Sequence, residues 1–119
     1  AMQAVMDAEI ALGNHPRDVS RDGVGYDIES RDGQTGRLRF IEVKGRKAGA
    51  KDIEVYHTEI LACLNTKEQF ILAIVEIEDG QAADPRYIVN PFQREPDDNA
   101  TSVKYDLGKL LVSSYNPYD

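Results

Sequence analysis

The segment from Phe70 to Ile77 constrains the fold more than any other part of the chain. Its eight residues, FILAIVEI, are apolar at every position except Glu76, and several are β-branched. A strand that is apolar on both faces has to be covered on both faces, whereas a half-buried strand alternates between apolar and polar residues. The sequence therefore predicts a central strand in a sheet that has other elements packed on each side.

Local periodicity and turn residues place the other elements around this strand. Helical spacing of apolar residues predicts helices over residues 2–12 and 58–65. Alternation and β-branched content predict four further strands, over residues 24–30, 37–44, 53–56 and 87–89. The polar segments 14–22 and 94–100 are predicted loops, and residues 103–113 fit either a strand or a short helix. The expected fold class is α/β (α+β), with a mixed central sheet flanked by helices.

Composition limits the class of protein. The 119 residues suit one compact domain, and 41% hydrophobic with 29% charged residues is typical of a soluble globular protein. No apolar run approaches the ~20 residues of a membrane span, so no membrane partner is expected. The single cysteine, Cys63, excludes an internal disulfide and favours a cytoplasmic location. Both chain ends abut structured-looking sequence, which is compatible with a domain cut from a longer protein.

Charge is distributed unevenly along the chain. The net charge of −7 argues mildly against a phosphate-binding surface. However, residues 15–51 hold nine Lys and Arg against six Asp and Glu, whereas residues 52–119 hold five against thirteen. The basic part of the chain is therefore the part that contains the stretch RLRFIEVKGRK, residues 37–47.

This stretch places charged residues where its pattern predicts a partly buried surface. Glu42 and Lys44 share the strand face of Leu38 and Phe40. Antiparallel pairing of the strands at 24–30 and 37–44, with residue numbers that sum to 69, sets Ile28 opposite Ile41. The same register sets Asp27 opposite Glu42, with Cβ atoms ~5 Å apart.

Two interpretations of Asp27, Glu42 and Lys44 follow from these positions. Two carboxylates at that distance repel each other unless a proton or a cation lies between them, and Mg²⁺ favours one or two carboxylates with several retained waters. The alternative is a solvated Glu42–Lys44 ion pair beside an exposed Asp27, since Glu-x-Lys occurs by chance in many strands. The residues alone leave both interpretations open.

Asp27 followed by Glu42-Val43-Lys44, on adjacent strands after an N-terminal helix, resembles the PD-(D/E)XK nuclease superfamily. More narrowly, the stretches PRDVS (16–20), GYDIES (25–30) and RFIEVKG (39–45) are similar to the domain of unknown function at the C-terminus of the plant protein NO VEIN. The resemblance extends over roughly residues 5–78. It implies an αβββαβ core, a single nuclease-like domain over residues 1–119, and metal-dependent hydrolysis of phosphodiester bonds.

The resemblance also implies roles for individual residues. Asp27 and Glu42 would bind Mg²⁺ or Mn²⁺, with the Val43 carbonyl as a third ligand. Lys44 would position the attacking water and stabilise charge on the phosphate. Glu9 would be an acid that the first helix aims at the same catalytic site.

Further features of the resemblance concern neighbouring residues and partners. Glu59 matches a recurrent acid at the start of the second helix. Tyr26 stands where the superfamily motif has proline, and Tyr56-His57-Thr58-Glu59 stands where the narrower family has Thr-x-Asn-Glu. Nucleic acid, expected to be DNA, would be contacted by basic side chains, and an attached helicase-like or ATPase domain is a candidate partner. These basic residues are Arg37, Arg39, Arg46, Lys47 and Lys51.

Two functional hypotheses result. The first is a Mg²⁺-dependent, endonuclease-like hydrolase, favoured by the presence of Asp27, Glu42 and Lys44 together. The second is a nuclease-like module that no longer cleaves and serves nucleic-acid or protein interaction, favoured by the acidic composition.

Overall fold

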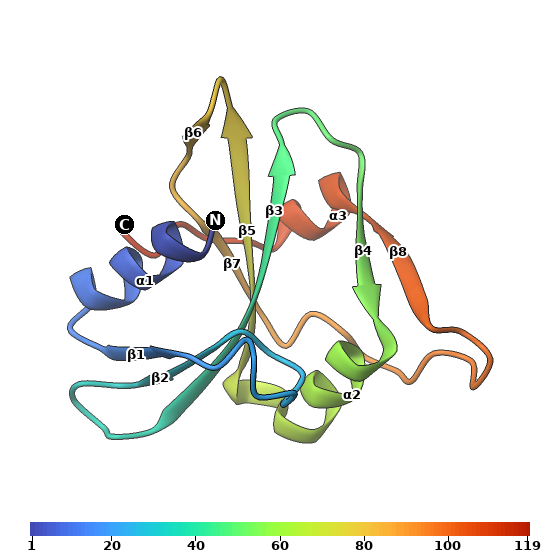
Figure 1. Ribbon diagram of the computed structural model, residues 1–119, viewed down its shortest axis with the longest axis horizontal. Coiled ribbons are helices and arrows are strands. Elements are labelled where there is room, and N and C mark those ends of the chain that lie inside the picture. The colour runs from blue at the N-terminus through green and yellow to red at the C-terminus, as the bar shows by residue number, and fades with distance from the viewer.

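The apolar segment forms β5 (Phe70–Glu78), which lies at the centre of a six-stranded sheet. The computed structural model describes residues 1–119. β3 (Leu38–Lys47) runs parallel to β5 on one side, and β7 (Arg86–Val89) runs antiparallel on the other. The predicted central strand and its predicted partner at 87–89 are both confirmed (Figure 1).

Three shorter strands complete the sheet. β2 (Ile28–Arg31) pairs antiparallel with β3, and β1 (His15–Asp18) pairs antiparallel with β2 at one edge. β6 (Gln81–Ala82) folds back on the end of β5. The sheet is therefore mixed, because one parallel pair lies among antiparallel pairs.

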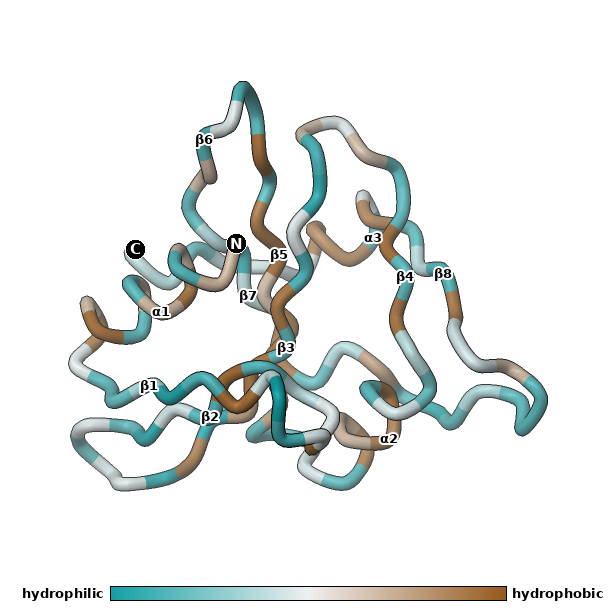
Figure 2. The backbone as a smooth tube through the Cα atoms, in the orientation of Figure 1, coloured by the Kyte–Doolittle hydropathy of each residue, from teal (hydrophilic) through white to brown (hydrophobic).

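Each face of the sheet carries its own apolar core. α1 (Met2–Ala11) buries Val5 against one face, where Ile28, Ile41 and Ile71 lie. α2 (His57–Thr66) covers the other face and packs against alternate residues of β5. Figure 2 shows hydrophobic residues along β5 and the middle of β3, between the two cores. Burial on both faces explains why the β5 sequence does not alternate.

A second sheet of two strands lies beside α2. It consists of β4 (Asp52–Tyr56) and β8 (Ser102–Asp106), which pair antiparallel and add apolar residues to the α2 core. The ambiguous segment 103–113 contains both predicted alternatives, because β8 is followed directly by α3 (Leu107–Val112). Asp106 marks the change, since its side chain accepts a hydrogen bond of 3.0 Å from the Lys109 amide and caps the helix.

The predicted strand over residues 24–30 is wrong in its first half. Residues 24–27 form a bend, and Tyr26 packs on Phe40 with ring centroids 4.8 Å apart. Tyr26 therefore lies on the α2 face, whereas Ile28 lies on the α1 face. The cause is Gly25, whose φ of +87° interrupts the extended backbone.

Two other differences follow from pairing that periodicity does not reveal. The predicted loop 14–22 contains β1, whose sequence HPRD has no apolar alternation and whose Pro16 is tolerated because β1 is an edge strand. β3 continues past Gly45 to Lys47, because its parallel pairing with β5 continues to Ile77.

The order of the main elements is α1, β1, β2, β3, α2, β5, with β4 inserted after β3. This order is the αβββαβ core that the resemblance implies. α1 and α2 have ten residues each, and no helix of the chain is both long and apolar enough to cross a membrane.

Candidate active site

Asp27 lies at the point where β2 leaves β3. Ile28 pairs with Ile41, so the predicted register is confirmed, and Asp27 is the residue just beyond the last pair. If the pairing of β2 with β3 continued, the Val43 N–H would donate to a backbone carbonyl of the neighbouring strand. Instead it donates to Asp27 Oδ2 at 2.9 Å. The bend thus replaces a backbone acceptor by a carboxylate, which is held at the edge of β3 next to Glu42.

Glu42 and Lys44 project from β3 towards the first turn of α2, and there they meet Glu59. Lys44 Nζ lies 2.8 Å from Glu59 Oε1 and 3.3 Å from Glu42 Oε2. Glu59 Oε1 also accepts the Tyr56 amide at 2.9 Å, which fixes the start of α2. The interpretation of Glu42 and Lys44 as a solvated pair is wrong, because the two side chains are only 4% and 16% exposed.

The cluster contains more negative than positive charge. Glu42 and Glu59 contact one ammonium group, Lys44 Nζ, and Asp27 adds a third negative charge next to Glu42. Burial raises the pKa of Glu42 far above 4.5, and a hydrogen bond to Glu59 with the charges of Glu59 and Asp27 raises it further. Burial opposes ionisation of Glu59 too, but hydrogen bonds from Glu42 and Lys44 lower its pKa overall. The surroundings therefore favour the protonated form of Glu42 and the ionised form of Glu59.

The donor atoms of the cluster suit a hard cation. Nowhere do three or more His, Cys, Asp or Glu side chains converge as a ready-made metal site. The available donors are the carboxylates of Asp27 and Glu42 and the backbone of Val43. A residue of a strand directs its N–H and C=O to the same edge, so the Val43 carbonyl points to the edge where Asp27 binds the Val43 N–H. Two carboxylates and a carbonyl leave room for the waters that Mg²⁺ retains.

The site does not lie in a large cleft. None of the larger surface clefts is lined by Asp27, Glu42 or Lys44. The largest, of about 540 Å³, lies at the carboxyl ends of β3 and β5, where Arg46 and Lys47 face Glu78 and Asp79. The contacts of Lys44 Nζ with Glu59 and Glu42 limit access to this ammonium group.

The structure does not bring Glu9 to this cluster. Glu9 is fully buried on the α1 face of the sheet, where Arg39 donates to its two oxygens at 2.9 and 3.0 Å. Tyr87 Oη donates to it at 2.8 Å and Asn14 Nδ2 at 3.1 Å. Burial alone would raise the pKa of Glu9, but the hydrogen bonds and charge of Arg39 outweigh it, so this pKa is lowered. The geometry gives Glu9 a role in holding α1 to the sheet.

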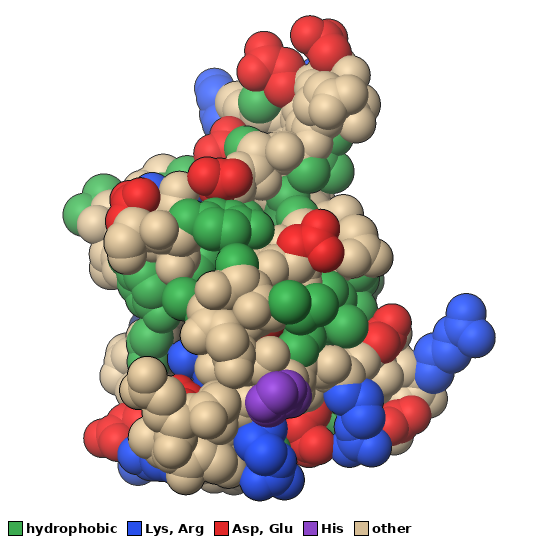
Figure 3. Space-filling model, turned by 90° about the vertical axis from the view of Figure 1, so that its left-hand side faces the viewer, with side chains coloured by type: hydrophobic (Ala, Val, Ile, Leu, Met, Phe, Trp, Pro, Cys, Tyr) green, Lys and Arg blue, Asp and Glu red, His purple; other side chains and the backbone are tan.

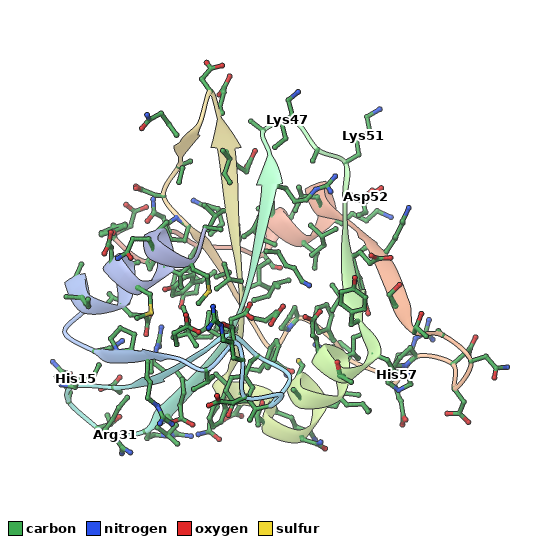
Figure 4. The ribbon with its side chains drawn as sticks, viewed as in Figure 1. His15, Arg31, Lys47, Lys51, Asp52 and His57 are labelled. Carbon is green, nitrogen blue, oxygen red and sulfur yellow. The ribbon has the colours of Figure 1, made fainter.

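The five basic residues predicted to contact nucleic acid do not form one patch. Arg39 is engaged by Glu9, and Arg37 is exposed where β3 begins. Arg46, Lys47 and Lys51 lie near the other end of β3, which spans roughly 30 Å for its ten residues. Lys47 and Lys51 extend from the upper end of the molecule, opposite Arg31 (Figure 4). Arg46 is 3.7 Å from Asp52 in an exposed pair.

The sequence predicted Glu59 only as a recurrent acid at the start of the second helix, but in the structure it completes the cluster. Its signal is local: Glu59 is the third residue of α2, where a carboxylate can accept the N-cap amide. What no periodicity shows is that β4 brings the start of α2 to the middle of β3. That placement depends on the pairing of β4 with the distant β8.

The elements together form a nuclease-like α+β fold of the resolvase type. The structure resembles that of Hjc, a Holliday junction resolvase from the archaeal hyperthermophile Archaeoglobus fulgidus, with a TM-score of 0.68 and 15% identity over 97% of this chain and 92% of that chain. The chain belongs to the family described as Protein NO VEIN, C-terminal, whose model matches residues 1–89. Among curated proteins none matches the sequence.

Proposed function

We propose that the chain is a metal-dependent nuclease domain that hydrolyses phosphodiester bonds, with DNA as its substrate. The observation that carries the proposal is a partly buried cluster at the middle of β3, where Glu42 pairs with Lys44, Asp27 binds the neighbouring Val43 N–H, and negative charge is in excess. Perturbed carboxylates around a lysine, where a bend brings two strands together, are typical of catalytic rather than purely structural sites. The resolvase-like fold supports DNA as the substrate.

The charge balance supports Mg²⁺ or Mn²⁺ as the cofactor. The raised pKa of Glu42, caused by burial and by the negative charges of Glu59 and Asp27, favours a proton that would compensate part of the negative charge. A divalent cation held by Asp27, Glu42 and the Val43 carbonyl would compensate it better and would displace that proton. When bound, such a cation supplies Lewis-acid activation of water and phosphate.

The chain's own residues supply positioning and charge. Lys44 Nζ can donate to a non-bridging oxygen of the scissile phosphate and stabilise the charge that develops there. Glu59 holds Lys44 in place through the 2.8 Å contact, and the Tyr56 amide holds Glu59 in turn. Arg46, Lys47 and Lys51 provide phosphate contacts beyond the site, at the carboxyl end of β3.

A specific observation favours a second function, that of a nuclease-like binding module without cleavage. Glu42 and Lys44 are buried and mutually paired, and no large cleft opens over them. In that function Lys44 and its neighbours stabilise the fold, and the exposed basic residues bind nucleic acid or a partner protein. The net charge of −7 is compatible with nucleic acid being delivered by an attached helicase-like or ATPase domain.

Cleavage assays with matched variants separate the two functions. Single-stranded, duplex and four-way DNA are incubated with Mg²⁺ or Mn²⁺ and wild-type protein, Asp27→Asn or Glu42→Gln. Glu54→Gln is the control, because Glu54 is an exposed carboxylate on β4. The nuclease proposal expects cleavage by wild type and Glu54→Gln and none by the other two. Absence of cleavage by wild type on every substrate and metal would favour the binding module.

A further inference from the structure

Tyr56 is an aromatic residue with no place in the core and a position beside the catalytic cluster. It is the last residue of β4, whose Ile53 and Val55 are 1% and 0% exposed, whereas Tyr56 is 50% exposed. The alternation of the strand turns Tyr56 outward, and its ring pairs with no other aromatic ring. Packing therefore does not account for an aromatic side chain at this position.

Lys44 connects this ring to the site. Lys44 Nζ lies over the Tyr56 ring, 5.4 Å from its centroid. The same ammonium is the group that meets the scissile phosphate in the proposed nuclease. A phosphate bound at Lys44 therefore brings the sugar and base of its own nucleotide next to the ring.

A hydrogen bond to the Tyr56 backbone fixes the position of this residue. Its amide donates to Glu59 Oε1, the atom that also binds Lys44 Nζ. Glu59 Oε1 thus holds both the Lys44 ammonium and the backbone from which the Tyr56 side chain projects. A preorganised ring loses little side-chain freedom when a flat ligand stacks on it.

We infer that Tyr56 stacks on an unpaired base next to the scissile phosphate, so that the domain selects single-stranded or locally unpaired nucleic acid. This inference rests on the proposed nuclease function for the position of the phosphate. Stacking of bases on aromatic side chains is tolerant of sequence, because every base has a π-face. A paired base inside a duplex is already stacked on its neighbours, and offering its face to Tyr56 requires unstacking that costs free energy.

The test measures binding in EDTA, where metal-dependent cleavage does not occur. The probes are a single-stranded oligonucleotide carrying 2-aminopurine and the same sequence as a duplex. Tyr56→Leu should weaken single-strand binding about tenfold and duplex binding less than twofold, and should abolish quenching of the probe. Tyr56→Phe should behave as wild type, because it keeps the ring.

Tyr118→Leu is the matched control, because Tyr118 is 49% exposed near the C-terminus, away from the cluster, and should bind as wild type. An equal loss of single-strand and duplex binding in Tyr56→Leu overturns the inference, as does an unchanged affinity or a wild type that binds no single strand. These outcomes do not depend on cleavage. If the wild type cuts no substrate but Tyr56→Leu loses single-strand binding selectively, the stacking inference is supported and the nuclease proposal fails. Normal cleavage with unchanged binding in Tyr56→Leu would support the nuclease proposal and overturn the stacking inference.

Discussion

At the scale of single residues, the charge of the site depends on two carboxylates that share the Lys44 ammonium and on a third, Asp27, beside Glu42. Glu42 is the most buried of the three, and burial together with the charges of the other two raises its pKa. This raised pKa is the feature that distinguishes the cluster from an ordinary ion pair on a strand. Two predictions test the charge balance directly, one through stability and one through rate.

The first prediction concerns pH in the absence of divalent metal. The folded-state pKa of Glu42 is raised above its unfolded value of about 4.5, so we expect the folded chain to bind an extra proton at neutral pH. Stability that is present below pH 4.5 is therefore lost as pH rises towards the raised pKa, by up to about 1.4 kcal/mol per pH unit. Denaturant unfolding at pH 6 and pH 8 should show wild type losing stability relative to Glu42→Gln.

Mg²⁺ provides the control for this measurement. A cation that displaces the proton should remove the pH dependence of wild type and leave Glu42→Gln unaffected. Parallel stability curves for the two proteins across pH 6 to 8 would show that Glu42 is ionised without metal.

The second prediction concerns Lys44. Lys44→Ala should reduce the cleavage rate by roughly a hundredfold or more, the scale of losing one electrostatic donor in a transition state. Metal binding should survive or tighten, because a competing positive charge is gone. Single-turnover cleavage and calorimetric metal titration measure the two effects separately. A variant that cuts as fast as wild type would remove Lys44 from the catalytic assignment.

At the scale of elements, the bend before β2 positions Asp27, and Gly25 makes the bend possible. A Cβ at Gly25 would lie 2.9 Å from Ala62 Cβ and 3.0 Å from Thr58 O, both in α2. The positive φ and the close approach of α2 are thus needed at the same residue. The bend therefore couples the position of Asp27 to the seating of α2, which carries Glu59.

The third prediction compares Gly25, in the bend, with Gly23, which lies just before it. Gly23 also has a positive φ, of +68°, but a Cβ there would meet nothing within 4 Å. Gly23→Ala should cost only the backbone strain, about 1 kcal/mol. Gly25→Ala should cost roughly 2 kcal/mol more and should weaken metal binding, because α2 has to move. Equal unfolding free energies for the two variants would mean that α2 does not press on Gly25.

The same elements show what the sequence can predict. The register of β2 and β3 follows from matching Ile28 with Ile41, and it places Asp27 near Glu42 without knowledge of the structure. The bend at Tyr26 could not be predicted from alternation, because Val24, Tyr26 and Ile28 mimic one strand face. The approach of Glu59 depends on β4 and β8, which are 45 residues or more apart in the chain.

At the scale of the whole molecule, the two faces of the sheet have separate tasks. The α2 face carries the candidate site, and the α1 face carries the buried network of Glu9, Arg39 and Tyr87. Figure 3 shows the α1 side with apolar side chains across its middle, acidic groups at the upper end and basic groups mixed with acidic ones at the lower end. This side therefore offers no continuous basic surface for a phosphate backbone.

The fourth prediction assigns the Glu9 network to stability. Glu9→Gln removes the charge that pairs with Arg39 and should destabilise the fold by roughly 3 kcal/mol, as expected for breaking a buried pair. Glu29→Gln, which breaks the exposed pair with Arg17, should cost less than about 1 kcal/mol. Cleavage per folded molecule should stay unchanged in Glu9→Gln. A large loss of rate without loss of stability would instead give Glu9 a direct catalytic role.

The fifth prediction links the metal to the stability of the whole domain. A cation that binds only the folded state stabilises it by mass action, and a concentration ten times the dissociation constant contributes about 1.4 kcal/mol. For a domain of this size that free energy corresponds to a rise in melting temperature of about 5 °C. Millimolar Mg²⁺ or Mn²⁺ should therefore raise the melting temperature of wild type, and Asp27→Asn should fold but not respond. Glu54→Gln controls for general screening of the acidic surface, because it removes one exposed carboxylate and keeps the cluster. An identical rise in Asp27→Asn and wild type would show that the cation acts on the surface charge and that Asp27 and Glu42 hold no metal.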